Sequence, residues 1–194
     1  AQVLTLNNSW TLEPRAGIKW QFSPKSSFAL AYGLHSRMEK MDVYFVKTQG
    51  TGDRSVNKDL GFTRAHHVML SYGFKVSDNM NMKIEPYFQQ LYDVPVISDS
   101  SYSVLNRRDF YVENALVNRG KGRNIGVDIT LERYLNKGLY YMVTASIFDS
   151  KYYGGDRKWR NTLYNRNFIV NVLGGKEWMV GRDRQNMFSV NFKI

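Results

Sequence analysis

Residues 15–22 read Arg15-Ala16-Gly17-Ile18-Lys19-Trp20-Gln21-Phe22, and their apolar and polar side chains alternate without interruption. Alternation with a period of two is typical of a β-strand that has one apolar and one polar face. After a Pro- and Ser-containing turn at residues 23–27, residues 28–35 repeat the alternation, with Phe28, Leu30 and Tyr32 on the apolar side. Two such runs joined by a short turn predict a β-hairpin.

The same hairpin pattern recurs three more times along the chain. The paired segments are residues 67–76 with 80–89, residues 124–132 with 141–147, and residues 168–172 with 188–194. The total is about eight strands of roughly ten residues, the length that a tilted strand needs to cross a bilayer. No segment sustains an apolar stripe with a helical period. The sequence therefore predicts an all-β fold, an antiparallel transmembrane β-barrel segment, with residues 1–194 as part of one domain.

The connections between the predicted strands are of two kinds. Partners within a hairpin are joined by about three to seven residues, as in a short hairpin turn. Successive hairpins are joined by the long stretches 36–66, 93–123 and 149–166. Such long connections are uncommon in a compact soluble domain. Short turns that alternate with long loops are typical of outer-membrane barrels, which have short periplasmic turns and long extracellular loops.

The two faces of the predicted strands differ in charge. The apolar series carries no Asp, Glu, Lys or Arg at mid-strand, where a cation costs roughly 2 to 4 kcal/mol at the bilayer midplane. We therefore expect Ile18, Leu70 and Val127 to face hydrocarbon and the ionisable groups to line a wet interior. A lipocalin would reverse the two faces, and alternation alone does not choose between them. The opposite series contains Arg15, Lys19, Lys75, Lys83, Glu85, Asp128 and Glu132.

Aromatic residues gather close to the short turns. On adjacent antiparallel strands this position places them at one level, which is typical of the aromatic girdle at a membrane interface. Aromatic residues are also common in strands generally. The predicted girdle consists of Trp20, Phe22, Phe28, Phe74, Tyr134, Tyr141 and Phe188.

The amino-acid composition limits the classes of protein to which the chain can belong. The chain has 43% hydrophobic residues, no cysteine and a formal net charge of +10. No run approaches the roughly 18 apolar residues of a spanning helix. The absence of cysteine excludes disulfides, thiolate zinc sites and cysteine nucleophiles. The positive charge is compatible with nucleic acid, acidic lipid or an anionic ligand, or with a piece that inherits the charge of its part of a larger protein.

No catalytic or metal-binding constellation is found in the sequence. His66 and His67 are adjacent, so on a regular strand they point to opposite faces and cannot chelate one metal ion. Asp128 and Glu132 lie about 13 Å apart along a strand, too far for a glycosidase pair. Residues 118–123 lack the spacing of a phosphate-binding loop, and we interpret them as a flexible, basic loop end. The prediction is that the chain is not an enzyme and holds no metal or cofactor.

The long loops are the predicted ligand surface. Aromatic rings among Arg and Lys side chains can stack on a sugar, a peptide or a chelate. The same rings can also pack within the loops or contact lipopolysaccharide. The candidate ligand-binding residues are Tyr44, Phe45, Tyr102, Phe110, Tyr111, Tyr152, Tyr153 and Trp159.

Five pieces of the sequence occur in an order that resembles a known family. They are residues 12–20 (LEPRAGIKW), 31–36 (AYGLHS), 85–96 (EPYFQQLYDVPV), 126–133 (GVDITLER) and 149–152 (DSKY). Together they resemble the barrel of TonB-dependent outer-membrane receptors of the type with a carboxypeptidase-regulatory-like domain. Each piece is moderately specific, and their shared order is stronger than any one of them.

The resemblance implies a 22-stranded barrel that is closed by an N-terminal plug and imports a scarce nutrient with energy from the inner membrane. The implied location is the bacterial outer membrane. The implied partners are outer-membrane lipid and lipopolysaccharide, the plug and remaining strands, an energy-coupling inner-membrane complex and a small nutrient ligand, with no nucleic acid. Residues 1–8 show no signal peptide, and the chain ends on Ile194 without a terminal aromatic residue. We therefore expect a late segment of a longer barrel.

Two other classes remain open from the sequence. One is a complete eight-stranded outer-membrane barrel with a structural or adhesin role, which requires the first strand to pair with the last. The other is a soluble lipocalin-like or nucleic-acid-binding β-protein, which requires a dry apolar centre or salt-dependent binding to DNA.

Overall fold

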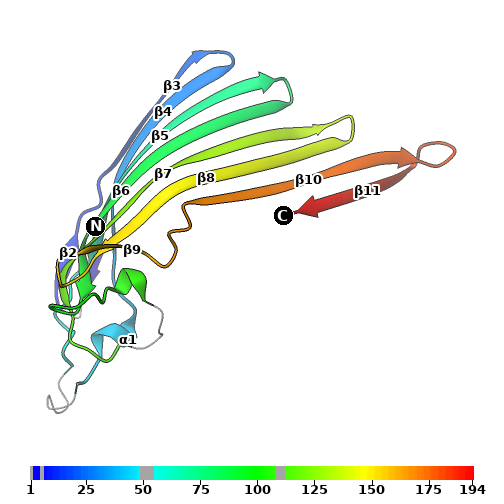
Figure 1. Cartoon of the computed structure of the whole chain (residues 1–194). Coiled ribbons are helices and arrows are strands. Elements are labelled where there is room, and N and C mark those ends of the chain that lie inside the picture. Colours follow the sequence, from blue (N-terminus) through cyan, green and yellow to red (C-terminus); the bar gives the residue numbers. More distant parts are fainter. Residues whose placement is uncertain (1, 5–6, 49–54, 108–111) are drawn as a thin grey trace.

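The computed structural model describes residues 2–4, 7–48, 55–107 and 112–194, and most of them belong to one curved antiparallel sheet (Figure 1). Its eight main strands are joined in chain order, so each strand pairs with its sequence neighbours. They are β3 (Arg15–Ser23), β4 (Ser26–Arg37), β5 (Thr63–Ser77), β6 (Met80–Val96), β7 (Val117–Asn136), β8 (Leu139–Tyr153), β10 (Phe168–Val180) and β11 (Asn186–Lys193). The predicted antiparallel all-β fold is confirmed.

Three short strands were not predicted from the sequence. The strand β9 (Trp159–Asn161) pairs with the loop end of β8, and β1 (Gln2–Leu4) pairs with β2 (Ser9–Thr11) as a separate ribbon. In the part of the chain that the structure describes, helix is limited to α1 (Met41–Tyr44) and the 3₁₀ turn η1 (Val104–Asn106). Among the described residues, no helix is long and apolar enough to cross a membrane.

The four hairpin turns lie at one end of the sheet and the long loops lie at the other (Figure 1). The turn between β7 and β8 places Lys137 at φ 50° and Gly138 at φ 74°. Two consecutive residues with positive φ form the turn type whose twist matches a two-residue hairpin. The predicted alternation of short turns and long loops is confirmed, although the loops are shorter than expected because β6, β7 and β8 extend further.

Residues 118–123 belong to β7 rather than to a flexible loop end, which corrects the sequence interpretation. Gly122 pairs with Leu91 of β6 and with Tyr152 of β8, so the segment is held on both sides. A Cβ atom on Gly122 would lie 2.6 Å from Leu105 Cδ1, and one on Gly120 would overlap the side chain of Val96. The glycines that resembled a mobile loop instead allow close packing beneath the loops.

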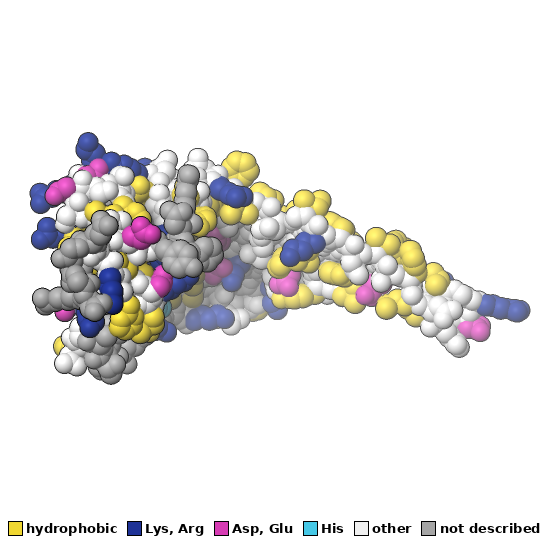
Figure 2. All heavy atoms as spheres, turned by 90° about the horizontal axis from the view of Figure 1, so that it is seen from below, with side chains coloured by type: hydrophobic (Ala, Val, Ile, Leu, Met, Phe, Trp, Pro, Cys, Tyr) yellow, Lys and Arg dark blue, Asp and Glu magenta, His cyan; other side chains and the backbone are white. Residues whose placement is uncertain are grey.

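The sheet has no apolar centre. Among the described residues, the main buried hydrophobic cluster lies in the loops and consists of Val43, Tyr44, Val46, Leu60, Phe62, Val112 and Leu116. By contrast, the apolar series of the strands is exposed, with Ile18 at 67% and Ile147 at 61%. Figure 2 shows hydrophobic side chains along the narrowing β10–β11 end, and charged side chains around the broad end that carries the loops. This arrangement is the opposite of a lipocalin.

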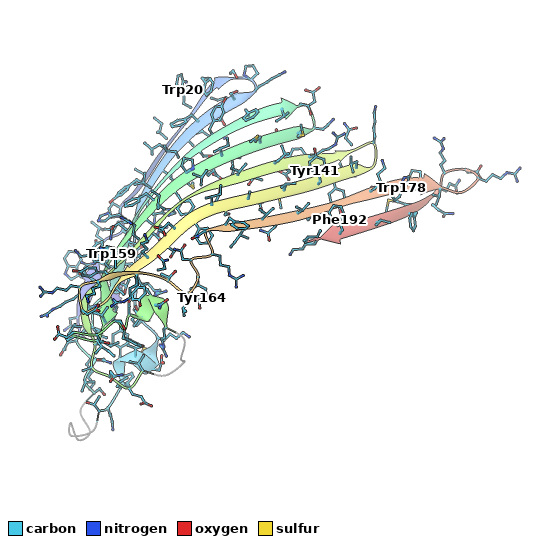
Figure 3. The ribbon with its side chains drawn as sticks, viewed as in Figure 1. Trp20, Tyr141, Trp159, Tyr164, Trp178 and Phe192 are labelled. Carbon is cyan, nitrogen blue, oxygen red and sulfur yellow. The ribbon has the colours of Figure 1, made fainter. Side chains whose placement is uncertain are left out.

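The expected aromatic girdle is found in part. Trp20, Phe22, Tyr72 and Phe74 form a chain of ring contacts with centroid separations of 5.5, 6.3 and 5.7 Å at the turn end of β3 to β5. Trp178 and Phe188 add a pair at 5.7 Å on β10 and β11, and Figure 3 shows Trp20, Tyr141 and Trp178 near the turn end.

Tyr134 was expected in the aromatic girdle but does not belong to it. It lies at the expected level but on the polar face, where its hydroxyl accepts a hydrogen bond from Asn81 Nδ2 at 3.2 Å.

The eight strands do not close on themselves. Strands β3 and β11 are the two edges of the sheet, and in the part of the chain that the structure describes they make no pairing with each other. A complete eight-stranded barrel would require that pairing, so this arrangement disfavours that alternative.

Candidate functional site

The long loops form one packed cap rather than three separate flexible segments. Asn57 lies at its centre and is 1% exposed. Its Nδ2 atom donates hydrogen bonds to the carbonyl oxygens of Val43 and Asn114, both at 3.0 Å. Its Oδ1 atom accepts the backbone N–H of Leu116 at 2.8 Å. One amide side chain therefore satisfies three backbone groups from two loops, which holds the β4–β5 loop against the β6–β7 loop.

The third loop is attached to this cap through polar contacts. The backbone N–H of Asp156 donates to the carbonyl of Ser100 at 3.0 Å, and that of Leu163 donates to Asn106 Oδ1 at 2.7 Å. Arg160 binds the Asp156 carboxylate with both terminal nitrogens, at 2.9 and 2.5 Å. This bidentate pair holds the pKa of Asp156 below its ordinary value of 3.8 and shapes the tip of the loop.

The candidate ligand residues of the loops fall into different environments. Tyr44 has no exposed surface, and burial raises its pKa, so its ring belongs to the packing of the cap. Phe45 is 48% exposed, whereas Tyr102 packs against the cap cluster. Phe110 and Tyr111 lie outside the described residues. The ligand role predicted for these residues remains a prediction.

The remaining candidates lie at the loop end of β8 and β9. Tyr152 is buried at 6% exposure on the polar face. Tyr153 and Trp159 lie on the apolar face, with ring centroids 5.4 Å apart. These two rings therefore point away from the polar face of the sheet, so the sequence candidates do not form one site.

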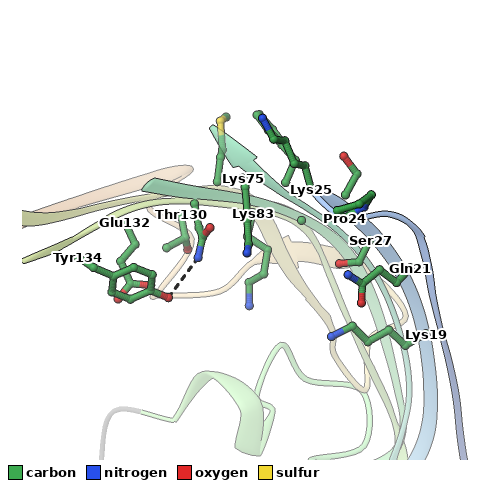
Figure 4. Close-up of a pocket in the computed structure, with 15 residues that line it drawn as sticks. Lys19, Gln21, Pro24, Lys25, Ser27, Lys75, Lys83, Thr130, Glu132 and Tyr134 are labelled. Carbon is green, nitrogen blue, oxygen red and sulfur yellow. Dashed lines mark hydrogen bonds between the residues drawn. The ribbon is translucent and has the colours of Figure 1, made fainter. Parts of the chain in front are cut away.

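The concave, polar face carries several hollows. At the turn end, a hollow of about 450 Å³ lies between β3 and β7, with Lys19, Lys75 and Lys83 beside Glu132 and Tyr134 (Figure 4). Lys83 is paired with Glu85, with Nζ and Oε2 2.8 Å apart. The ionisable series therefore lines the inside of the curve, as expected, and remains open to water at this end.

A second hollow lies at the loop end, beneath the third loop. It has a volume of about 410 Å³ and combines ring and amide side chains from β5 to β8 with Tyr164 from the loop. Tyr164 is 67% exposed and is labelled in Figure 3 on the concave side of the sheet. The lining residues are His67, Met69, Tyr87, Gln89, Asn124, Asp128, Phe148, Ser150 and Tyr164.

A chain of hydrogen bonds runs across this loop-end hollow. Asn124 Nδ2 donates to Gln89 Oε1 at 2.7 Å, and Ser150 Oγ donates to Asn124 Oδ1 at 2.7 Å. Thr162 Oγ1 then donates to Ser150 Oγ at 3.0 Å, which connects the wall to the third loop. Fixed amides beside aromatic rings are suited to binding a polar small molecule through hydrogen bonds and ring contacts.

The sequence reasoning missed this hollow. The turn at Lys137 and Gly138 sets the β7–β8 register and could have placed Asn124 opposite Ser150. The β6–β7 register, which brings Gln89 beside Asn124, follows a long connection and could not be derived from a turn. Tyr164 lies in a loop, where no periodicity indicates direction.

The histidines follow the strand geometry. His66 stacks with Tyr92 at 5.2 Å on the apolar face, whereas His67 lies on the polar face with its ring 6.2 Å from that of His35. The prediction that His66 and His67 point to opposite faces is confirmed. Within the described ranges, no cluster of three or more His, Asp or Glu side chains is arranged to hold a metal ion.

Comparisons with known proteins identify the fold. No protein-family model matches the sequence, and no curated protein matches it. Among solved structures, the chain is similar to the FrpB iron transporter from Neisseria meningitidis (F3-3 variant), with a TM-score of 0.57 and 14% sequence identity. The match covers 89% of this chain and 25% of the transporter, so the chain spans about a quarter of its length. At this identity the likeness shows the fold alone, an antiparallel all-β sheet that resembles part of the transporter's β-barrel.

Proposed function

We propose that this chain forms part of the barrel wall of a TonB-dependent outer-membrane receptor and contributes to energy-dependent nutrient uptake. The observation that carries the proposal is the contrast between the two faces of the sheet. The convex face presents an uncovered apolar series, and the concave face presents ionisable and amide groups around open hollows. Soluble monomers rarely expose an apolar area of this kind.

Hydrocarbon is the proposed environment of the convex face. In water the exposed face of Ile18, Leu70 and Ile147 would promote aggregation. In a bilayer the same side chains are solvated by acyl chains, and every strand of a closed barrel has its backbone groups paired. We place the chain in the bacterial outer membrane, with the turns in the periplasm and the loop cap outside.

The loop-end hollow is the proposed contact with the nutrient. Gln89 and Asn124 present amides on the barrel wall, and Tyr87 and Tyr164 present rings from the wall and the third loop. The likeness to a protein described as an iron transporter supports transport rather than catalysis. The chemistry of the lining favours a polar small molecule or a metal chelate.

The proposed partners follow from the surfaces that remain open. Strands β3 and β11 each leave one edge for the remaining strands of a larger barrel, 22 in the family that the sequence resembles. The concave polar face would receive the plug. Coupling to the inner-membrane complex would depend on parts outside these residues.

Single-cysteine labelling in intact cells tests the topology, because the chain has no cysteine of its own. Lys158→Cys lies in the third loop, and Lys137→Cys lies in the β7–β8 turn. A membrane-impermeant maleimide added to whole cells should label position 158 and should label position 137 only after the outer membrane is opened. Equal labelling at both positions in intact cells, or recovery of the protein without detergent, would overturn the proposal.

A further inference from the structure

The loop-end hollow is built on a regular grid of side chains from three neighbouring strands. On the concave face, alternate residues of β6, β7 and β8 lie opposite one another in consecutive rows. Successive rows are about 7 Å apart, because residues two positions apart on a strand share a face. From the loop side, the rows are Gln89, Asn124 and Ser150, then Tyr87, Gly126 and Phe148, then Glu85, Asp128 and Ser146. The wall therefore changes from amides and a hydroxyl group, through aromatic rings, to carboxylates.

Gly126 opens the middle of the ring row. A Cβ atom at this position would lie 2.7 Å from the hydroxyl oxygen of Tyr87 and 2.8 Å from Phe148 Cβ. The side chains of Tyr87 and Phe148 therefore border a position that holds no side chain of its own. Tyr164 of the third loop lines the same hollow from the concave side (Figure 3). The backbone of Gly126 is thus a floor with aromatic rings around it.

Asp128 gives the hollow a negative charge. Among the described residues that line the hollow, it is the only one that is charged when histidine is neutral. Its carboxylate forms no ion pair with a described residue. Glu85 lies directly opposite in β6, and its own carboxylate is paired with Lys83 Nζ at 2.8 Å. Like charges directly opposite each other on a sheet repel, so Asp128 favours a cation in the hollow.

A ligand with an organic ammonium group fits both features. An ammonium group above Gly126 would lie between the rings of Tyr87 and Phe148, and the faces of aromatic rings attract cations. It would also lie one row from the Asp128 carboxylate. A bare Ca²⁺ or Mg²⁺ ion would fit less well, because each requires several oxygen ligands. In the amide row, the side-chain nitrogen of Gln89 is not used in the hydrogen-bond chain described above, so it can donate to a hydroxyl group of the same ligand.

We propose that the loop-end hollow binds small molecules that carry an organic ammonium group and hydroxyl groups, with the ammonium group between Tyr87 and Phe148 and beside Asp128. The inference rests on the proposed function, which makes this hollow the contact with the nutrient, and it narrows that nutrient to an organic cation. A neutral molecule binds less tightly because it leaves Asp128 without a counter-charge, and an anionic molecule is repelled.

The test measures the binding of two probes of equal shape to the full protein, purified in a mild detergent. Choline carries a quaternary ammonium group and a hydroxyl group, and its neutral isostere has a tert-butyl group in place of the trimethylammonium group. In calorimetric titration, choline should bind about tenfold more tightly than the isostere, since cation–π and charge-assisted contacts both require the positive charge. Asp128→Asn should remove this preference. Glu132→Gln is the matched control, because it removes a carboxylate from the same strand and face at the turn-end hollow, and it should keep the preference.

A third variant tests the rings, and the comparison of the two probes in the wild-type protein does not depend on how well any variant folds. Phe148→Leu keeps an apolar side chain without a π-face, and it should weaken choline binding about threefold or more while leaving the isostere unchanged. Equal binding of both probes to the wild type, binding of neither, unchanged choline binding in Phe148→Leu, or equal loss in Asp128→Asn and Glu132→Gln would overturn the inference. Absence of the wild-type protein from the outer membrane would instead overturn the proposed function.

Discussion

Asn57 and Leu116 are 59 residues apart in the sequence, yet the side-chain oxygen of Asn57 accepts the backbone N–H of Leu116 at 2.8 Å. This bond connects two loops that leave different hairpins. The cap is therefore a small folded unit with its own buried polar centre, mounted on the end of a sheet that has no comparable core.

Replacement of Asn57 should loosen the cap without unfolding the sheet. Asn57→Ala leaves three backbone groups without partners, those of Val43 and Leu116 buried and that of Asn114 partly buried, which should destabilise the cap by about 2 kcal/mol or more. Hydrogen exchange should accelerate in residues 38–48 and 97–107 while β5 and β6 stay protected. Asn114→Ala keeps the backbone carbonyl that accepts from Asn57, removes only the side-chain amide of an exposed residue, and should change little. Unchanged exchange in the Asn57 variant would show that the hydrogen bonds of Asn57 do not hold the cap.

A charged side chain should destabilise the protein on one face of β8 and leave its stability nearly unchanged on the other. Ile147 and Ser146 are neighbours whose side chains point to the convex and concave faces. Although Ile147 is 61% exposed, Ile147→Arg should cost roughly 2 to 4 kcal/mol in a bilayer, as a cation does at the midplane of a barrel. Ser146→Arg would lie opposite Asp128 and should be nearly neutral. Urea titration of protein folded into lipid vesicles measures both values, and equal stability of the two variants contradicts the assignment of faces.

The turn between β7 and β8 should depend on its glycine. Gly138 has φ 74°, and an added Cβ would overlap the carbonyl oxygen of Glu177 in β10. Gly138→Ala should therefore destabilise the folded sheet by about 1 to 3 kcal/mol, measured as a lower unfolding temperature in detergent. Gly17→Ala is the matched control, because its Cβ would meet only Leu30 O at 3.5 Å. A similar loss in both variants would argue against strain at this turn.

The third loop should loosen only in acid. Arg160 holds the pKa of Asp156 below 3.8, so the folded loop binds a proton less readily than the unfolded loop does. The stabilising contribution is therefore fully present above the ordinary pKa and is lost as the pH falls through the lower folded value. The carboxyl ¹³C shift of Asp156, assigned by its absence in Asp156→Asn, should titrate below 3.8. Titration at or above 3.8 would show that the bidentate pair is not formed.

Much of the sheet could be predicted because strand geometry is local. Alternation around Ile18, Leu70 and Val127 identifies the strands, and the short turns join them into hairpins. The loop-end extension of β7 could not be predicted in this way, because Gly120 and Gly122 interrupt the alternation and resemble a loop. The three-residue strands β1, β2 and β9 are too short to show a period.

The candidate site was less predictable because it depends on which strands lie opposite each other. Gln89 and Asn124 are 35 residues apart and meet only through the β6–β7 register. Tyr44 shows the converse case, since an aromatic residue in a long loop suggested a binding surface but belongs to the buried hydrophobic cluster of the cap. The exposure of a loop side chain depends on tertiary contacts such as those of Asn57. These contacts leave no periodic pattern in the sequence.

The direction of the edge strands has a consequence for how such sheets can grow. Strand β3 runs away from the loop side and β11 runs back toward it, so the backbone arrives and departs at the same rim. The eight strands therefore form four hairpins, each of which starts and ends on the loop side of the sheet. Insertion or deletion of one hairpin would change the circumference of a barrel, and every long loop would still lie on its original side of the sheet. Duplication of hairpins thus offers a route to sheets of different width that preserves the orientation of the loop cap.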